Sequence, residues 1–125
     1  MQLFIDDGYT VRVGLKAAPG RAALEFDLRP FAGADGHRRY LQSRLADDAT
    51  DIVLGDMLGD GTADHPARIC DWNLPRPLTR DNLRRLRSPE FTALMLAMYD
   101  QIVPDYEVVD GKPAPYELTA DREKN

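Results

Sequence analysis

The sequence has few of the residues that build disulfide, metal or redox sites. Cys70 is the only cysteine among 125 residues, so no disulfide can form within the chain, which fits a reducing compartment. The only histidines are His37 and His65, and a structural zinc site needs a full set of nitrogen or sulfur ligands, usually as close pairs. Glycine-rich phosphate loops and dinucleotide fingerprints are also missing. We therefore expect no metal and no cofactor.

Long apolar runs and an excess of positive charge are also lacking. No stretch approaches the ~20 apolar residues of a transmembrane helix, so we expect no association with membranes. Residues 1–7 lack the basic start and apolar run of a signal peptide, which favours a cytoplasmic location. The net charge is -5, and an acidic chain gains little from contacts with phosphate, so we expect no binding of bulk nucleic acid.

Two alternating segments near the start of the chain predict an antiparallel β-hairpin. Apolar residues alternate with polar residues or glycine over 9–15 and again over 23–29, which is typical of half-buried strands. The turn signal Pro19-Gly20 lies between them, and residues 1–5 are a candidate third strand. A lone hairpin is marginal in water, so its apolar face must pack against other elements. That face is predicted to contain Tyr9, Val11, Val13, Leu15, Leu24, Phe26 and Leu28.

The rest of the chain predicts helices that cover this hairpin. One helix is expected from about Asp35 to about Leu58. Thr79 is the predicted N-cap of a short helix that turns Leu83 and Leu86 inward. Ser88, followed by proline, is the predicted N-cap of a last helix that ends before the proline at 104. The predicted core stripes are Leu41, Leu45, Ala49 and Ile52 in the long helix, and Phe91, Leu94, Met95, Met98, Tyr99 and Ile102 in the last one.

These elements predict a single α+β domain over residues 1–103, with an N-terminal antiparallel β-hairpin of two to three strands packed against three to four helices. A chain of this length can bury a modest core without disulfides or metals. Residues 104–125 are predicted to form an acidic, proline-containing C-terminal tail that is partly disordered past about Leu118.

Two clusters of reactive side chains have simpler structural explanations. Asp56, Asp60 and Asp64 recur every four residues around a glycine-rich loop, but the alternate oxygen ligands and closing glutamate of a calcium loop are missing. A solvated turn explains them better. His65 could activate Cys70 as a nucleophile, but nothing marks an oxyanion hole or a third, orienting group. A small buried cysteine explains Cys70 better.

Paired carboxylates form a third cluster. Glu25 and Asp27 share one face of a predicted strand, where two carboxylates could divide acid and base roles. The exposed face of an amphipathic strand explains them better. We therefore expect no enzymatic activity and no catalytic residues.

Arginines and methionines give the best candidates for protein contacts. Residues 76–87 contain five arginines and one aspartate, a local charge of +4. A solvated helix face explains this charge, and docking onto an acidic partner is the functional alternative. Methionine adapts its shape to varied partners, although a core helix face is the simpler explanation. The predicted contact residues are Arg80, Arg84, Arg85, Met95 and Met98.

Several short phrases, taken in order, resemble small tail-assembly chaperones and related tail proteins of phages and prophages. The resemblance covers roughly residues 9–103, and Pro75-Arg76-Pro77 stands where the family usually has a longer turn with Asp-Gly-type residues. The matching phrases are Phe26-Asp27-Leu28-Arg29-Pro30-Phe31, Ile69-Cys70-Asp71-Trp72-Asn73-Leu74, Pro77-Leu78-Thr79, Asn82-Leu83, Leu86 and Phe91.

The resemblance implies an α+β or mostly helical fold without cofactor or catalysis. It also implies a role in tail morphogenesis, in which the protein shields apolar surface of tape-measure or tube proteins until assembly. Its place would be the host cytoplasm, or the virion for a structural tail protein. Two other functions stay open: a cellular adaptor or regulatory module that binds proteins, and a small ligand-binding domain or enzyme with a concave polar site that contains His65 or the aspartate-rich loop. A homo-oligomer is an open alternative for the assembly state.

Overall fold

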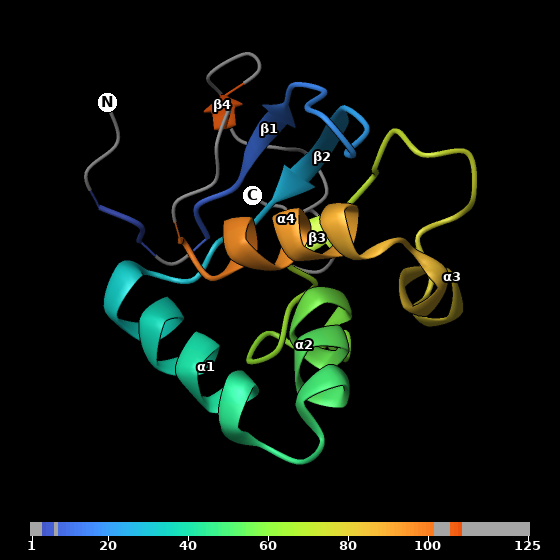
Figure 1. Cartoon of the computed structure of the whole chain (residues 1–125). Helices are drawn as coiled ribbons and strands as arrows, with labels where there is room; N and C mark the ends of the chain where they lie inside the picture. The colour runs from blue at the N-terminus through green and yellow to red at the C-terminus, as the bar shows by residue number, and fades with distance from the viewer. Residues whose placement is uncertain (1–3, 7, 102–105, 109–125) are drawn as a thin grey trace.

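The computed structural model describes residues 4–6, 8–101 and 106–108, and in them helices pack against one face of an antiparallel sheet (Figure 1). The mixture confirms the predicted α+β fold with an N-terminal hairpin. None of the helices in these described residues is long and apolar enough to cross a membrane. In chain order the elements are β1 (Val11–Leu15), β2 (Leu24–Leu28), α1 (Gly33–Leu45), α2 (Ala49–Leu58), β3 (Ile69–Cys70), α3 (Arg80–Arg85), α4 (Ser88–Met98) and β4 (Tyr106–Val108).

The sheet has the strand order β3-β2-β1-β4, and all of its neighbouring strands are antiparallel. The predicted hairpin is confirmed: Val13 pairs with Phe26, and Gly20 takes a φ of 80° in the connecting turn. Phe4 and Ile5, in the candidate third strand, are not in a strand, and residues 1–3 lie outside the described residues. Later segments, β3 and β4, extend the sheet instead.

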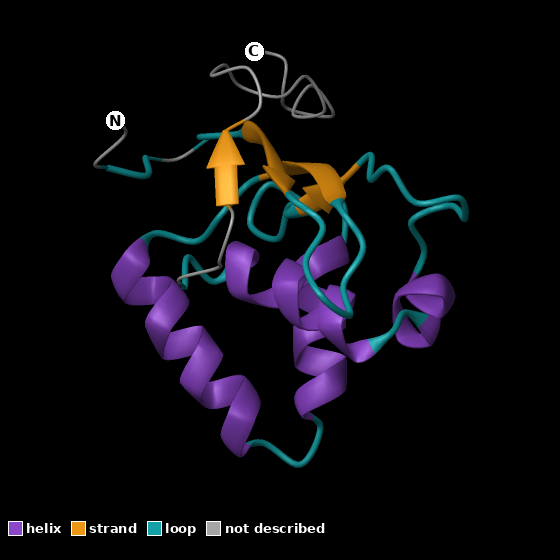
Figure 2. Cartoon of the chain, turned by 45° about the horizontal axis from the view of Figure 1, so that its top comes forward, coloured by secondary structure: helices purple, strands orange, loops and turns teal. Residues whose placement is uncertain are grey.

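The inner face of the hairpin forms the core together with α2 and α4. The six predicted strand residues from Val11 to Leu28 are at most 3% exposed, and Tyr9 is half-buried beside them. Helices cover this face of the sheet (Figure 2). Burial of each such large side chain is worth about 1.5–3 kcal/mol, so this layer dominates the stability of the fold. The completely buried residues of the helices are Leu54, Met57, Leu83, Leu94 and Met98, and Tyr99, directly after α4, is completely buried as well.

The single long helix predicted over residues 35–58 is wrong. α1 ends at Leu45, Ala46 takes an extended conformation with a ψ of 149°, and α2 begins at Ala49. Asp47 and Asp48 explain the break, because acidic side chains are unfavourable at a helix C-terminus and favourable at the N-terminus of the next helix. The predicted core stripe is wrong for its α1 residues, since Leu41 is 45% exposed and Leu45 is 85% exposed, whereas Ala49 and Ile52 of α2 are half-buried.

Small residues on the opposite side of α1 make the contact with the body of the protein. Gly36 and Ser43 are buried. A Cβ at Gly36 would lie 2.2 Å from the carbonyl oxygen of Tyr99, which only glycine permits. Phe31 stacks on the Tyr99 ring at 5.6 Å between centroids, so an aromatic contact joins the start of α1 to the end of α4.

A polar network ties three helices together beneath these rings. The Tyr99 hydroxyl donates to the Asp56 carboxylate of α2 at 2.7 Å, and Arg39 of α1 also binds that carboxylate. Burial, and then the hydrogen bond to Asp56, raise the pKa of Tyr99 well above its usual value, so the phenol stays protonated and able to donate. Arg39 is therefore half-buried and paired with Asp56.

The starts of the last two helices follow the predicted signals with one correction. Thr79 is the N-cap of α3, as predicted, and its hydroxyl accepts from the backbone N–H of Asn82 at 3.1 Å. The predicted N-cap at Ser88 is wrong: Arg87 caps α4, because its backbone is extended and its carbonyl already accepts from the N–H of Phe91. α4 ends at Met98, and residues 102 and 104 lie outside the described residues.

Candidate functional site

The predicted reactive clusters are dispersed or internally satisfied in the structure. Asp56 is held in the helix network, and Asp60 accepts from the hydroxyl of Thr62 at 2.6 Å and from its N–H at 3.0 Å, which lowers the pKa of Asp60. His65 is exposed in the same loop, and Cys70 is half-buried in β3. Within the described part of the chain, no group of three or more His, Cys, Asp or Glu residues could hold a metal ion.

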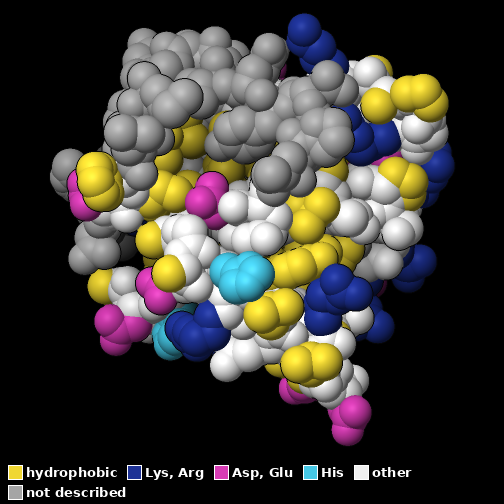
Figure 3. All heavy atoms as spheres, turned by 60° about the vertical axis from the view of Figure 1, so that its left-hand side comes forward, with side chains coloured by type: hydrophobic (Ala, Val, Ile, Leu, Met, Phe, Trp, Pro, Cys, Tyr) yellow, Lys and Arg dark blue, Asp and Glu magenta, His cyan; other side chains and the backbone are white. Residues whose placement is uncertain are grey.

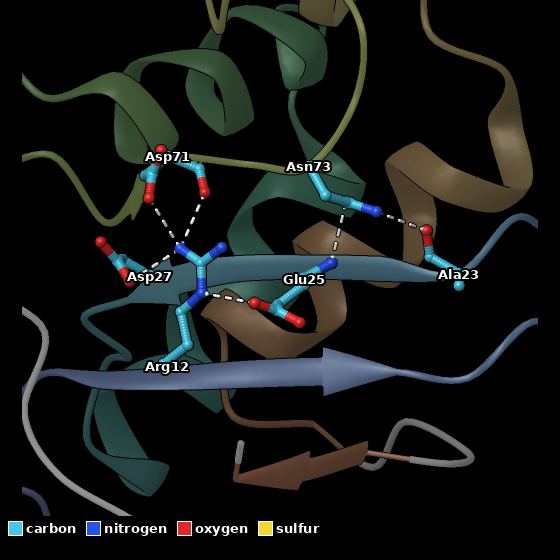
Figure 4. Close-up of polar contacts among 6 residues, drawn as sticks. All are labelled: Arg12, Ala23, Glu25, Asp27, Asp71 and Asn73. Carbon is cyan, nitrogen blue, oxygen red and sulfur yellow. Dashed lines mark hydrogen bonds and ion pairs between the residues drawn. The ribbon is translucent and has the colours of Figure 1, made fainter. Parts of the chain in front are cut away.

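The paired carboxylates of β2 are held by one arginine. The Arg12 guanidinium of β1 donates to Glu25 at 3.1 Å and to Asp27 at 3.0 Å (Figure 4). Asp27 is only 4% exposed, so the prediction of an exposed position is wrong for it, because β3 pairs beside it and covers the strand edge. Burial opposes the charge on Arg12, but the hydrogen bonds to Asp27 and Glu25 outweigh it and raise the pKa of Arg12.

The same arginine fixes the segment that follows β3. Arg12 donates to the backbone carbonyl of Asp71 at 2.8 Å and to its carboxylate at 3.0 Å, while Asp71 takes a left-handed φ of 51°. Asn73 then binds the β2 backbone, because it donates to the carbonyl of Ala23 and accepts from the N–H of Glu25 (Figure 4). Trp72, between these anchors, is therefore placed by the sheet.

A groove of about 270 Å³ lies between this anchored segment and α3. We call it the Trp72 groove. Apolar walls and arginine side chains form it, and none of its lining residues is acidic. The tryptophan ring is oriented by a hydrogen bond from its Nε1 to the carbonyl of Arg76 at 2.6 Å. The lining residues are Trp72, Leu74, Pro75, Arg76, Asn82, Arg85, Leu86 and Arg87.

The α3 wall of the groove is also fixed in place. The Thr79 hydroxyl caps the helix, and the Asn82 side chain donates to the carbonyl of Pro77 at 2.9 Å. Leu83, on the inner side of α3, is 0% exposed and belongs to the core. Both walls are thus anchored to the body of the protein, so the groove exists before any partner arrives.

The structure separates the predicted contact residues. Only Arg85 lines the groove, where it also pairs with Asp81 one turn earlier. Arg80 instead binds Asp51 of α2 at 2.6 Å, and Arg84 is exposed on α3 without lining the groove.

The methionines belong to the interior. The prediction of Met98 as a contact residue is wrong, because its side chain is completely buried, and Met95 is half-buried against the core. Sequence reasoning missed Arg76 and Arg87 as part of one groove, although the excess of arginines over residues 76–87 was the available signal.

Two polar hollows lie beside the loop that follows α2. One, of about 390 Å³, is lined by residues that include Tyr9, Asp64 and Arg68. The other, of about 220 Å³, includes Asp64, His65 and Arg68. Arg68 already lies over the Phe31 ring, with its guanidinium carbon 3.5 Å from the ring centroid. These hollows near His65 fit the ligand-binding alternative.

Comparison of the chain with protein-family models, with curated proteins and with solved structures gives no match in any of the three. The function must therefore be inferred from the chemistry of the Trp72 groove and its surroundings.

Proposed function

We propose that this protein is a non-enzymatic docking protein of the phage tail-assembly type, which binds an acidic, apolar segment of another tail protein in the Trp72 groove. The observation that carries the proposal is the composition of the groove, in which three arginines surround apolar walls and no acid is present. Carboxylates of the partner would lie against Arg76, Arg85 and Arg87, and an apolar side chain would lie against Trp72 and Leu86.

The residue types of the groove suit protein binding. Tryptophan and arginine are the residues that most often carry binding energy at protein interfaces. The charge of the groove is opposite to that of the whole chain, which is -5, so it is a local feature that would select and steer acidic partners. Because both walls are anchored, little conformational entropy would be lost on binding.

The resemblance to tail proteins coincides with this groove. Trp72, Leu74, Asn82 and Leu86 come from three phrases of the resemblance, and all four line the groove. A packing role alone would explain Leu83, which is completely buried, but these four residues keep part of their surface at the groove. Tape-measure and tube proteins, whose apolar surface needs covering before assembly, are the proposed partners.

The test compares two neighbouring arginines of α3. Arg85 lines the groove and Arg84 does not, so Arg85→Glu and Arg84→Glu make the same change of charge with different consequences. We expect Arg85→Glu to weaken binding of candidate tape-measure or tube proteins by at least about tenfold. Arg84→Glu should bind within about twofold of the wild type. Isothermal titration calorimetry at fixed salt measures both.

A second groove variant guards against a helix effect. Arg85→Glu removes the pair with Asp81 and places two acids one helical turn apart, which costs only about 0.5 kcal/mol of helix stability. Arg76→Glu changes the opposite wall, outside any helix, and should weaken binding similarly. Equal affinity of all three variants for a tail protein would refute the Trp72 groove as the binding site. Binding to host proteins alone would favour the cellular adaptor.

A small-ligand site is the second candidate, favoured by the polar hollow beside His65. Arg38, Arg39 and Arg68 line the hollow together with that histidine, and so do Asp56, which already pairs with Arg39, and Asp64. The excess of basic over acidic groups suits a small anion. A rise in melting temperature with phosphate or a dicarboxylate that is lost in His65→Ala would support this candidate. No response of the wild-type protein to such anions would count against it.

A further inference from the structure

The outward face of α1 carries an apolar seam that the described fold leaves uncovered. Leu41 and Leu45 are 45% and 85% exposed, one helical turn apart. Arg38, three residues before Leu41, is also exposed, so the steps of three and four residues from Arg38 to Leu45 are those of a coiled-coil seam, and Asp47 and Asp48 are exposed in the turn that follows α1. Figure 3 brings the α1 side of the molecule forward and shows hydrophobic side chains at the surface among basic and acidic ones.

The packing of α1 fixes this seam on the outside. Gly36 and Ser43 are seven residues apart and both buried, so they mark the inner line of the helix. The close approach of Gly36 to the Tyr99 carbonyl prevents any rotation that would turn the leucines inward. Exposure of Leu41 and Leu45 therefore follows from the fold itself, and burial of both leucines against a partner would be favourable.

Opposite charges at the two ends make the seam complementary to itself. Arg38 lies at the start of the seam, and the exposed Asp47 and Asp48 follow Leu45. Two such helices placed antiparallel would pack Leu41 against Leu45 and would bring each Arg38 to the turn after the other copy's α1, which carries its two aspartates. Such a contact has a two-fold axis and closes on itself.

One further charge near the axis is already held elsewhere. Arg44 lies over the ring of Tyr40, 5.6 Å from its centroid, and donates to the tyrosine hydroxyl at 3.3 Å. Its positive charge is thus directed to the side of the helix and not along the leucine seam.

We propose that α1 pairs antiparallel with α1 of a second copy of this chain, through Leu41 and Leu45, with Arg38 paired to Asp47 and Asp48 across the axis.

The first test is the mass of the full chain by sedimentation equilibrium over a concentration series. We expect the wild type to be a dimer and Leu45→Glu a monomer with the same circular dichroism spectrum and melting temperature, because the side chain is 85% exposed. Ala17→Glu adds the same charge at an exposed position in the hairpin connection and should stay dimeric. A monomeric wild type at all concentrations, or a dimeric Leu45→Glu, would overturn the proposal.

The second test reads the orientation of the helices. Arg38→Glu, and separately Asp47→Lys with Asp48→Lys, each place like charges at both ends of the antiparallel pair and should weaken the dimer at least about tenfold. An equimolar mixture of the two variants restores opposite charges at both ends, so native mass spectrometry should show the mixed dimer. Failure of the mixture to dimerise would exclude the antiparallel arrangement.

Discussion

Replacement of Gly36 by alanine tests how α1 is held against α4. The new Cβ would lie 2.2 Å from the carbonyl oxygen of Tyr99 and 2.8 Å from its carbonyl carbon. Both are backbone atoms, so the helix must move by about 1 Å to reach ordinary contact, and overpacking of this kind costs about 1–3 kcal/mol. The shift also disturbs the stacking of Phe31 on Tyr99, worth about 0.5–1.5 kcal/mol.

The same substitution in α2 provides the control. Alanine is favoured over glycine in a helix by about 1 kcal/mol, and a Cβ at Gly55 meets no atom within 4 Å. Gly55→Ala should therefore raise the free energy of unfolding by about 0.5–1 kcal/mol, whereas Gly36→Ala should lower it by about 1–3 kcal/mol. Urea titration followed by circular dichroism measures both, and thermal melts should differ by roughly 4 °C for each kcal/mol.

The result that would refute this reasoning is a Gly36→Ala protein as stable as Gly55→Ala. α1 would then not approach the end of α4 as described. The outward orientation of Leu41 and Leu45 would lose its physical reason as well, because the close approach of Gly36 is what prevents the helix from rotating.

Three further predictions concern contacts that join the elements. Thr79→Ala removes the cap of α3 and should lower the free energy of unfolding by about 1 kcal/mol in urea. Tyr99→Phe removes the donor to Asp56 and should lower the free energy of unfolding by about 1–3 kcal/mol. Equal stability of this variant and the wild type would contradict this and would mean that Arg39 alone satisfies the carboxylate. The Ala22 N–H, 2.7 Å from the buried Glu90 carboxylate, lowers the pKa of Glu90 below its usual 4.5. The charged form of Glu90 therefore stabilises the fold above pH 4.5, and this stabilisation is lost as the pH falls through the pKa of the folded state. Glu90→Gln should have a lower melting temperature than the wild type at pH 7 and should lose less stability between pH 7 and pH 3. The same dependence of melting temperature on pH in both proteins would contradict this.

Local signals in the sequence were enough to predict the hairpin and the cap of α3. Alternation over 9–15 and 23–29 reports directly which residues face inward, because side chains of a strand point to opposite faces in turn. The hydroxyl of Thr79 acts on a backbone group only three residues away, so its role is visible in a short window.

Features that depend on distant pairings could not be predicted in this way. β3 has two residues and β4 has three, too few to show alternation, and each is defined by its partner strand. The burial of Asp27 depends on β3, and its charge is satisfied by Arg12 from another strand. The Trp72 groove forms only when segments held by the sheet and by α3 come together, so the arginines appeared in the sequence as one charged helix face.

The most direct test of the proposed docking role uses the only tryptophan of the chain as its reporter. Trp72 lines the groove, so its emission can be followed while candidate tape-measure or tube proteins are added at low and high salt. We predict a shift of the emission maximum on binding, with an affinity that falls as salt rises because arginines meet carboxylates. Binding that leaves the Trp72 emission unchanged, or that does not depend on salt, would contradict the account.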